Sequence, residues 1–270
     1  MKDPTFERYR VEPGAKFRLS RKDPDDKAGM EKEEGLKELE KIRDRLDPLQ
    51  ELLYAEHKHR VLIVLQGMDT SGKDGTIRKV FEGVNPEGVE VAHFGPPTQE
   101  ETDRGFLWRE HLRVPKTGEI AIFNRSYYEG VLVVRVHRLA PPDVWKKRFD
   151  EINDFERMLT QEGTTILKFY LNISGDEQKK RFEERLKDPT KHWKFSTNDL
   201  PEREYWDQYM AAYEDAIEKT STPHAPWYVV PSNHRWLRDL VVCSVIEQTL
   251  TGLKMEYPKL PKADKSLKVR

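Results

Sequence analysis

The chain has 270 residues, enough for one large domain, or for a domain with a subdomain, built on a full hydrophobic core. Apolar residues make up 36% of it and charged residues 35%, and the single cysteine, Cys243, excludes an internal disulfide and a zinc site of several cysteines. No apolar run approaches the roughly 20 residues of a membrane-spanning helix, and the charged N-terminus lacks a signal-peptide core, so we expect a cytoplasmic protein. The formal net charge of −1 still allows a local basic site for an anionic substrate.

The first 34 residues, 1–34, are polar and contain prolines, which predicts an arm that is draped over the body or partly disordered. A helical pattern of apolar residues starts at Gly35, and Pro48 is expected to kink that helix or to start a new one. We assign residues 35–255 to one domain. Residues 256–270 form a basic tail, which is either solvated or in contact with a polyanion.

Strands and helices alternate after this first helix. Short apolar runs predict strands at residues 60–66, 89–94, 118–126, 164–173 and 225–232. Helices are expected at residues 75–84, 97–112, 141–163, 175–188, 201–220 and 233–253, with a polar loop at 189–200. Thr98 and Glu101 have the spacing of a capping box. This order predicts an α/β fold of three layers, in which helices cover both faces of a five-stranded parallel sheet.

A phosphate-binding loop is predicted directly after the first strand, in the stretch LIVLQGMDTSGKDG. Gly67, Gly72 and Lys73 match the pattern G-x-x-x-x-G-K-[ST], but Asp74 takes its last place. Backbone N–H groups can converge on an anion here, and the strand–loop–helix context favours phosphate binding over a tight glycine turn with an incidental lysine. The candidate phosphate-binding residues are Gly67, Thr70, Ser71, Gly72, Lys73, Asp74 and Gly75.

Asp69 is a candidate metal ligand inside this loop. A carboxylate is a hard oxygen ligand that suits Mg²⁺, so Asp69 could replace the missing hydroxyl; the alternative is an acid that caps the loop. Asp74 is better explained as an acid at the positive end of a helix. Asn124 ends the third strand, where phosphate-loop enzymes keep a second metal-binding acid, and Arg125 can bind a phosphate with two hydrogen bonds. The alternative for this pair is a strand end capped by asparagine.

A charged segment follows the fourth strand, at residues 177–197. Arg181 and Arg185 lie four residues apart and therefore share one helix face. Such a cationic segment predicts a lid, at about residues 174–200, that closes over transferring phosphates. The alternative is a solvated helix with ion pairs between successive turns.

With these segments, the chain resembles the polyphosphate kinase 2 family. The matching stretches are GMDTSGKDG, FGPPTQEE, FLWREHLRVPKTGEIAIFNRSYYE, KKRFEERLKDPTKHWKFSTND and VVPSNHRWLRDLVV. The resemblance implies a thymidylate-kinase-like P-loop fold with a lid, and reversible, Mg²⁺-dependent phosphoryl transfer between inorganic polyphosphate and nucleotides. Asn124 stands where the family most often has aspartate, a pattern of the class III subgroup, which accepts both AMP and ADP.

The resemblance also implies residue roles. Lys73 would hold phosphates, Asp69 would bind the metal or orient the acceptor, Arg125 would clamp phosphates, and Arg181 and Arg185 would be lid arginines. Further candidates for contacts with nucleotide or polyphosphate are Glu129, Arg135, Lys187, Lys191 and Lys194.

The implied partners are inorganic polyphosphate, AMP, ADP and ATP, with Mg²⁺ or Mn²⁺ as the cofactor. We expect no nucleic-acid or membrane partner and a homo-oligomer, either a dimer or a tetramer. Two other functions fit the same patterns: an ATP-dependent nucleoside monophosphate kinase, and a regulatory protein that binds nucleotide or polyphosphate without turnover. The absence of an acid at Asn124 is the best argument for the second.

Overall fold

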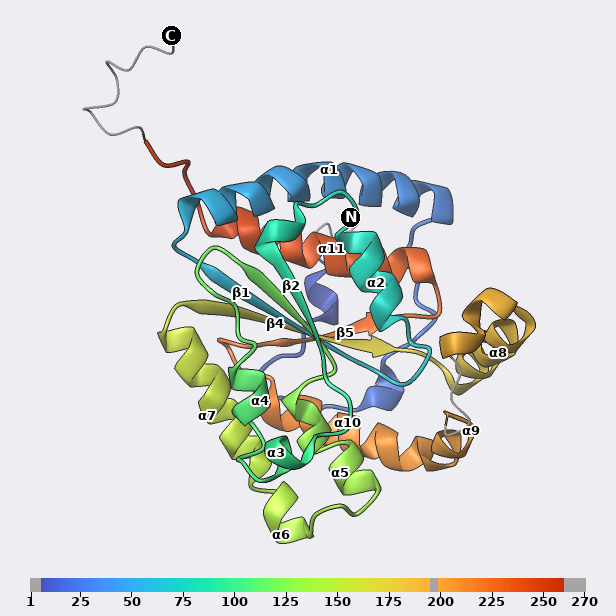
Figure 1. Cartoon of the computed structure of the whole chain (residues 1–270). Coiled ribbons are helices and arrows are strands. Elements are labelled where there is room, and N and C mark those ends of the chain that lie inside the picture. The colour runs from blue at the N-terminus through green and yellow to red at the C-terminus, as the bar shows by residue number, and fades with distance from the viewer. Residues whose placement is uncertain (1–5, 195–198, 260–270) are drawn as a thin grey trace.

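The computed structural model describes residues 6–194 and 199–259 of the chain. Five strands form one sheet in the order β2-β3-β1-β4-β5, and all neighbouring strands are parallel (Figure 1). The strands are β1 (Arg60–Gln66), β2 (Val89–His93), β3 (Ile120–Asn124), β4 (Thr164–Asn172) and β5 (Trp227–Pro231). Each lies inside its predicted range, so the predicted five-stranded parallel sheet is confirmed.

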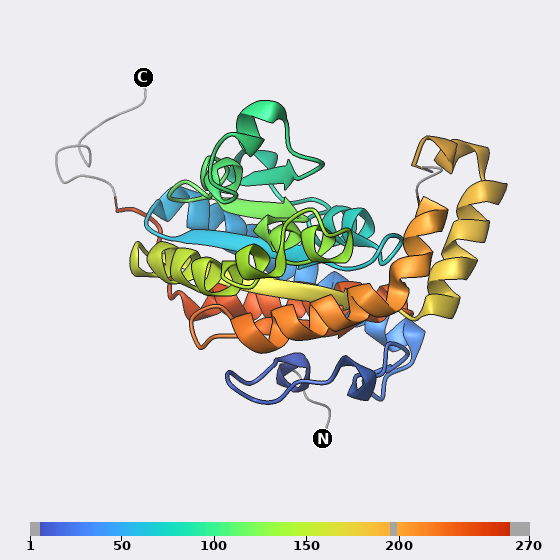
Figure 2. The same ribbon diagram turned by 90° about the horizontal axis from the view of Figure 1, so that it is seen from below.

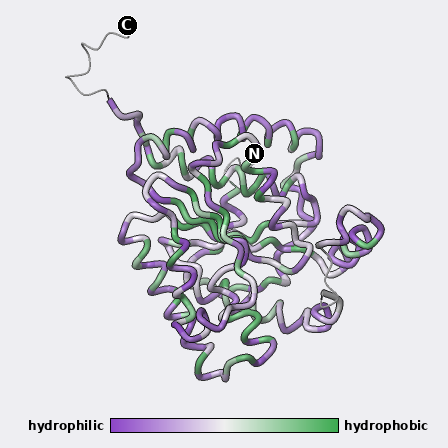
Figure 3. The backbone as a smooth tube through the Cα atoms, viewed as in Figure 1, coloured by the Kyte–Doolittle hydropathy of each residue, from purple (hydrophilic) through white to green (hydrophobic). Residues whose placement is uncertain are grey.

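Both faces of the sheet are covered, which explains why β1 is apolar along almost its whole length. Successive side chains of a strand point to opposite faces. Accordingly, Leu62 and Val64 belong to one hydrophobic cluster, while Val61, Ile63 and Leu65 belong to a second one on the other face. In Figure 3, the hydrophobic colour is concentrated along the central strands, and many hydrophilic residues lie in the helices around them.

Two groups of helices form the outer layers. One face carries α1 (Lys32–Glu56), α2 (Lys73–Val80) and α11 (Arg235–Gly252). The other carries α3 (Gln99–Thr102), α4 (Trp108–His111), α5 (Val133–Val136), α6 (Pro142–Trp145), α7 (Arg148–Gln161) and α10 (Trp206–Thr220). The helices α8 (Gly175–Lys187) and α9 (Asp199–Glu202) stand beyond the strand ends (Figure 2). Short 3₁₀ helices connect these elements: η1 (Glu7–Tyr9), η2 (Leu19–Arg21), η3 (Pro86–Gly88), η4 (Tyr127–Gly130), η5 (Pro189–Lys194) and η6 (Arg203–Tyr205).

Several predicted helix boundaries were wrong. Pro48 lies inside α1 and starts no new helix. Pro48 and Asp44, the residue whose carbonyl loses its helical donor, are exposed, so water can reach that carbonyl, while buried residues before and after the proline keep the helix packed. The stretch 97–112 forms two helices separated around Gly105, although Thr98 and Glu101 make the predicted capping box. The stretch 141–163 is likewise divided into α6 and α7, and the expected loop 189–200 contains η5 and the start of α9.

Residues 6–31 run along the sheet edge at β5. Arg10 forms an isolated antiparallel bridge with Tyr228, and the Val11 N–H donates to the Trp227 carbonyl at 2.8 Å. Five apolar side chains of this arm are buried: Phe6, Tyr9, Val11, Phe17 and Leu19.

Most of the predicted basic tail, residues 260–270, lies outside the described residues. None of the helices in the described part of the chain is long and apolar enough to cross a membrane.

The crossing of α1 and α11 depends on Gly35, because a Cβ atom there would overlap the ring of the buried Trp236. We expect Gly35→Leu to lower the free energy of unfolding by about 1–3 kcal/mol. The matched control is Gly252→Leu, since a Cβ at Gly252 meets nothing within 4 Å. Urea denaturation of both variants tests this, and equal stabilities would contradict the close contact.

Candidate active site

The carboxyl ends of the three central strands bring the predicted segments together. β1 lies between β3 and β4, so the loop after β1 is adjacent to the residues that follow each neighbour. The Arg125 guanidinium, after β3, lies 2.9 Å from Oδ1 of Asp69 in the loop. The Gln178 amide, on α8 after β4, donates to the Asp69 carbonyl at 3.1 Å. A candidate active site therefore forms where the strand order reverses, as is usual in open α/β sheets.

The loop requires glycine at two positions. Gly67 has φ of +151°, and a Cβ there would lie 2.9 Å from the Leu171 carbonyl oxygen. Gly72 has φ of +111°, and a Cβ there would overlap the Arg238 guanidinium. Because side chains are strained in this backbone region and neighbouring atoms fill the space, both glycines are needed for the loop to close against β4 and α11.

Lys73 begins α2, and its ammonium group turns back over the loop. Its Nζ donates to the Gly67 carbonyl at 2.6 Å. The pKa of Lys73 is lowered to about 8, first by burial and then by the positive Arg125, while Asp69, Glu129 and Asp74 oppose the shift. The free protein thus holds a half-buried ammonium group whose charge an anionic ligand would stabilise.

Asp69 and Arg125 form an ion pair that remains accessible. Their side chains are 30% and 43% exposed, respectively. Burial lowers the pKa of Arg125, but the neighbouring carboxylates of Glu129 and Asp69 raise it above its ordinary value, so the guanidinium stays charged. Burial raises the pKa of Glu129, and Arg125 and Lys73 oppose that shift. Cations and carboxylates therefore alternate across this site.

Asn124 contacts the acid that replaces the usual hydroxyl residue. Its Nδ2 donates to Oδ1 of Asp74 at 2.7 Å and lies 3.1 Å from Nδ1 of His93. The Asn124 side chain thereby links the end of β3 to the first turn of α2. The predicted capping role of Asn124 and its predicted place beside a ligand are both compatible with this position.

The side chain of Arg181, on α8, supports the backbone of the phosphate loop. Arg181 is buried, and its guanidinium donates to the carbonyls of Thr70 and Ser71 at 3.0 and 3.1 Å and to those of Ser232 and Asn233 at 2.6 and 2.9 Å. Arg181 therefore supports the backbone of the loop, since its donors point at protein carbonyls, and its role as a lid arginine stays a prediction.

A buried pair on α11 supports the same loop. Arg238 donates to the Ser71 carbonyl at 3.2 Å and pairs with Asp239, whose Oδ1 accepts a hydrogen bond from Thr76 of α2 at 3.1 Å. No role for Gln178, Arg238 or Asp239 is predicted from the sequence. One signal was available: an Arg–Asp pair next to the continuously apolar stretch LVV at the start of a core helix, where charges are rare unless paired.

The other predicted residues lie further along α5, α8 and η5. Arg185 lies over the ring of Phe182, with 5.5 Å between Cζ and the ring centre. Arg135 pairs with Asp215 of α10 at 2.6 Å. Lys187 and Lys191 are exposed, and Lys191 contacts Asp188 at 2.6 Å. The side chain of Lys194 lies outside what the structure describes, and the predicted roles of these residues stay predictions.

Comparison with known proteins shows to which protein family the chain belongs. The strand order and the loop are those of a P-loop fold, and the chain belongs to the polyphosphate kinase 2 family, whose family model matches residues 29–259. An AMP/ADP-polyphosphate phosphotransferase of Meiothermus ruber is 56% identical over 256 residues, which cover 94% of this chain and 96% of that protein. An ADP-polyphosphate phosphotransferase of Rhodopseudomonas palustris is 46% identical over 80% of this chain and 79% of that protein.

A solved structure agrees with this assignment. The crystal structure of polyphosphate kinase 2 from Arthrobacter aurescens TC1 superimposes with a TM-score of 0.92 at 45% identity, and the match covers 99% of this chain and 94% of that one. The resemblance to the polyphosphate kinase 2 family and the predicted P-loop fold are thus confirmed.

The pKa of Lys73 predicts how polyanion binding depends on pH. With its pKa lowered to about 8, Lys73 loses its charge in the free protein as the pH rises above 8. We expect the Kd for inorganic polyphosphate to rise above pH 8, by at most about tenfold per pH unit. Calorimetric titration from pH 6.5 to 9.5 measures this. Lys73→Arg keeps its charge throughout, so an equally steep rise in that variant would contradict the assignment.

The support by Arg181 predicts a difference between two arginines of one helix. Arg181→Met removes the guanidinium donors to four carbonyls and to Glu177, and of these carbonyls Ser71 keeps a donor from Arg238. We expect the free energy of unfolding to fall by about 2–4 kcal/mol. Arg185→Met removes a partly exposed side chain and should change it by at most about 0.5 kcal/mol. Urea denaturation compares the two variants, and similar losses would refute the supporting role.

Proposed function

We propose that this chain transfers phosphoryl groups between inorganic polyphosphate and the nucleotides AMP and ADP. The observation that carries the proposal is its 56% identity, along nearly the full length of both chains, to an AMP/ADP-polyphosphate phosphotransferase. Asn124, the residue that suggested the subgroup accepting both nucleotides, supports the same substrate range. Lys73, Arg125 and Asp69 come together at the carboxyl ends of the central strands, where the reaction could take place.

The acceptor chemistry matches the residues present. The attacking group of AMP or ADP is a phosphate oxygen, which is already ionised at neutral pH, so the site needs no strong general base. It needs instead to bring two anions together and to neutralise the charge on the transferring group. Lys73 on the loop and Arg125 after β3 provide fixed positive charges from two neighbouring strands.

The donor set at Asp69 fits a magnesium ion. Within residues 6–194 and 199–259, no three histidine, cysteine or acidic side chains are grouped to hold a metal by themselves. Mg²⁺ usually takes one or two carboxylates and completes its shell with phosphates and water, so Asp69 with substrate oxygens suffices. When bound, the ion would neutralise charge on both substrates. We propose Asp69 as its protein ligand, which also explains how the loop functions without a serine or threonine at position 74.

The lid is proposed to include the part of the cationic segment beyond the root of α8. Gln178 and Arg181 attach that root to the loop, while Arg185, Lys187 and Lys191 lie further along α8 and η5. These three residues would contact polyphosphate or nucleotide when the segment folds over the site. Homo-oligomerisation, as a dimer or tetramer, stays a prediction.

An ATP-dependent nucleoside monophosphate kinase was the main alternative, and the relatives favour polyphosphate as the donor. An assay without ATP separates the two: the chain is incubated with polyphosphate, Mg²⁺ and either AMP or ADP. We expect ADP and ATP to form. Polyphosphate binding without any product would instead support a regulatory protein.

In this assay, Lys73→Ala and Asp69→Asn should each reduce kcat by about 100-fold or more, because each removes a charge that contacts the reacting phosphates. The matched controls are Lys41→Ala and Asp154→Asn, which change exposed side chains on α1 and α7. Thermal melting checks that all four variants are folded. Rates near that of the unchanged protein in both loop variants would contradict the assignment of Lys73 and Asp69 to the active site.

A further inference from the structure

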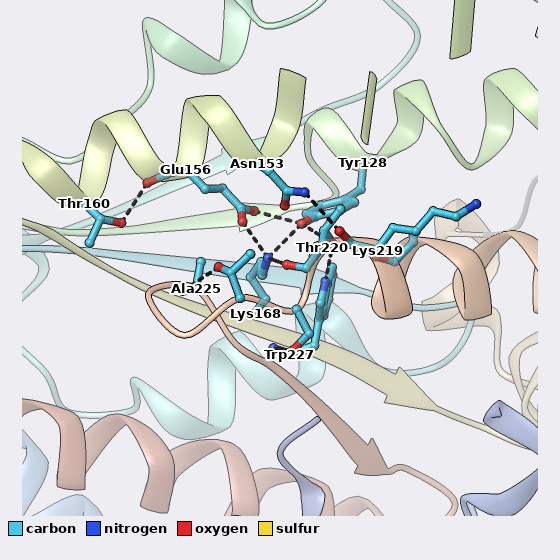
Figure 4. A network of polar contacts seen from close by, with 12 residues as sticks. Tyr128, Asn153, Glu156, Thr160, Lys168, Lys219, Thr220, Ala225 and Trp227 are labelled. Atoms are coloured by element: carbon cyan, nitrogen blue, oxygen red, sulfur yellow. Dashed lines mark hydrogen bonds and ion pairs between the residues drawn. The ribbon is translucent and has the colours of Figure 1, made fainter. Parts of the chain in front are cut away.

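A buried ion pair lies inside the helical layer behind the site. Glu156 of α7 and Lys168 of β4 are both fully buried, and Nζ lies 2.6 Å from Oε2 (Figure 4). Lys168 uses all three of its N–H donors, because Nζ also contacts the Tyr128 hydroxyl at 2.9 Å and the Thr220 carbonyl at 2.7 Å. Neither residue of this pair has a part in the phosphoryl transfer proposed for this chain.

The other carboxylate oxygen of Glu156 binds two consecutive tyrosines. Its Oε1 accepts hydrogen bonds from the hydroxyl groups of Tyr127 at 2.9 Å and of Tyr128 at 2.8 Å. The Trp227 indole N–H, from β5, reaches the same network through the hydroxyl of Thr220 at 2.8 Å. Figure 4 shows how side chains from α7, β4, β5 and α10 surround the Tyr128 hydroxyl. The 3₁₀ helix η4 is thereby attached to four elements of the core.

The Glu156–Lys168 ion pair is not expected to add much to the free energy of unfolding. Two charges taken out of water cost several kcal/mol each, and buried ion pairs replaced by apolar side chains of similar volume are often no less stable. A fully satisfied polar network does, however, fix one arrangement of its members, because any other arrangement leaves a buried charge without partners. The pair is therefore suited to fixing the geometry of what it holds.

What it holds is the segment from Arg125 to Glu129. Arg125 has φ of +63°, a backbone conformation that is strained for residues other than glycine and persists only where the surroundings impose it. Ser126 accepts a hydrogen bond from the Tyr128 N–H at 3.2 Å, and the two tyrosines come next. Glu129, the following residue, acts electrostatically on both Lys73 and Arg125.

We propose that the buried Glu156–Lys168 pair is a positioning device, which orients Arg125 and Glu129 for phosphoryl transfer by fixing Tyr127 and Tyr128. This inference rests on the proposed function. Loosening the tyrosines lets the strained Arg125 backbone relax, and the guanidinium then spends less time beside Asp69. Misplacement by about 1 Å of a group that orients reactants can cost about 100-fold in rate, so the effect should fall mainly on kcat.

The test compares the double variant Tyr127→Phe/Tyr128→Phe with Tyr9→Phe. Both keep the rings and remove hydroxyl groups that are bonded to a carboxylate; Tyr9 contacts Asp26 of the arm at 2.9 Å, far along the chain from the site. For the double variant we expect kcat to fall tenfold or more, with KM for polyphosphate changed less than threefold. Amide exchange in residues 125–130 should also become faster. Tyr9→Phe should show neither effect.

A quadruple variant separates positioning from stability. Adding Glu156→Leu and Lys168→Met to the double variant makes the network apolar, and its melting temperature should return towards that of the unchanged protein while kcat stays low. A kcat that recovers together with the melting temperature would overturn the proposal, as would unchanged kcat and exchange in the double variant. If the unchanged protein shows no polyphosphate transfer, the proposed function fails, and exchange in residues 125–130 alone decides whether the pair fixes this segment.

Discussion

The structure depends on holding two like charges close together before any phosphate is present. Lys73 and Arg125 disfavour each other, and burial further disfavours the Lys73 ammonium. The acids Asp69, Asp74 and Glu129 oppose this effect on Lys73 from separate places: one within the loop, one on the first turn of α2, and one on η4. Substrate phosphates can then replace part of this internal neutralisation, because the same ammonium group that the acids stabilise can also pair with an anion.

Most of the contacts around the site fix the backbone and leave the reacting surface open. Arg181 and Gln178 attach α8 to the loop, and Arg238 with Asp239 attaches α11 to the loop and to α2. The arginine and glutamine side chains donate hydrogen bonds to loop carbonyl groups that have no hydrogen-bond donor within the glycine-rich loop itself. The long cationic side chains differ accordingly: the buried arginines Arg181 and Arg238 support the loop, whereas Lys187 and Lys191 of α8 and η5 are exposed.

Asp74 takes the place of the usual serine or threonine in the phosphate loop, and the two acids of the loop, Asp74 and Asp69, have different partners. Asp74, in its place, accepts the amide of Asn124, so position 74 connects α2 to β3. Asp69, which follows the neighbouring strand β1, is partly exposed and faces Arg125. The residue that departs from the common loop pattern and the asparagine at the end of β3 are thus joined by one hydrogen bond.

The sequence by itself determined the five strands, the loop at Gly67–Lys73 and the family, because apolar runs and glycine spacing report local burial and backbone conformation. It left open whether a new helix starts at Pro48, and the structure shows that α1 continues through it, since packing of α1 on α11 outweighs the local cost of a proline whose neighbourhood is open to water. It could not tell that Arg181 faces the loop backbone, nor that Glu156 and Lys168 meet in the core. Those facts depend on which side chains face each other across helices and strands, and only the tertiary structure decides that.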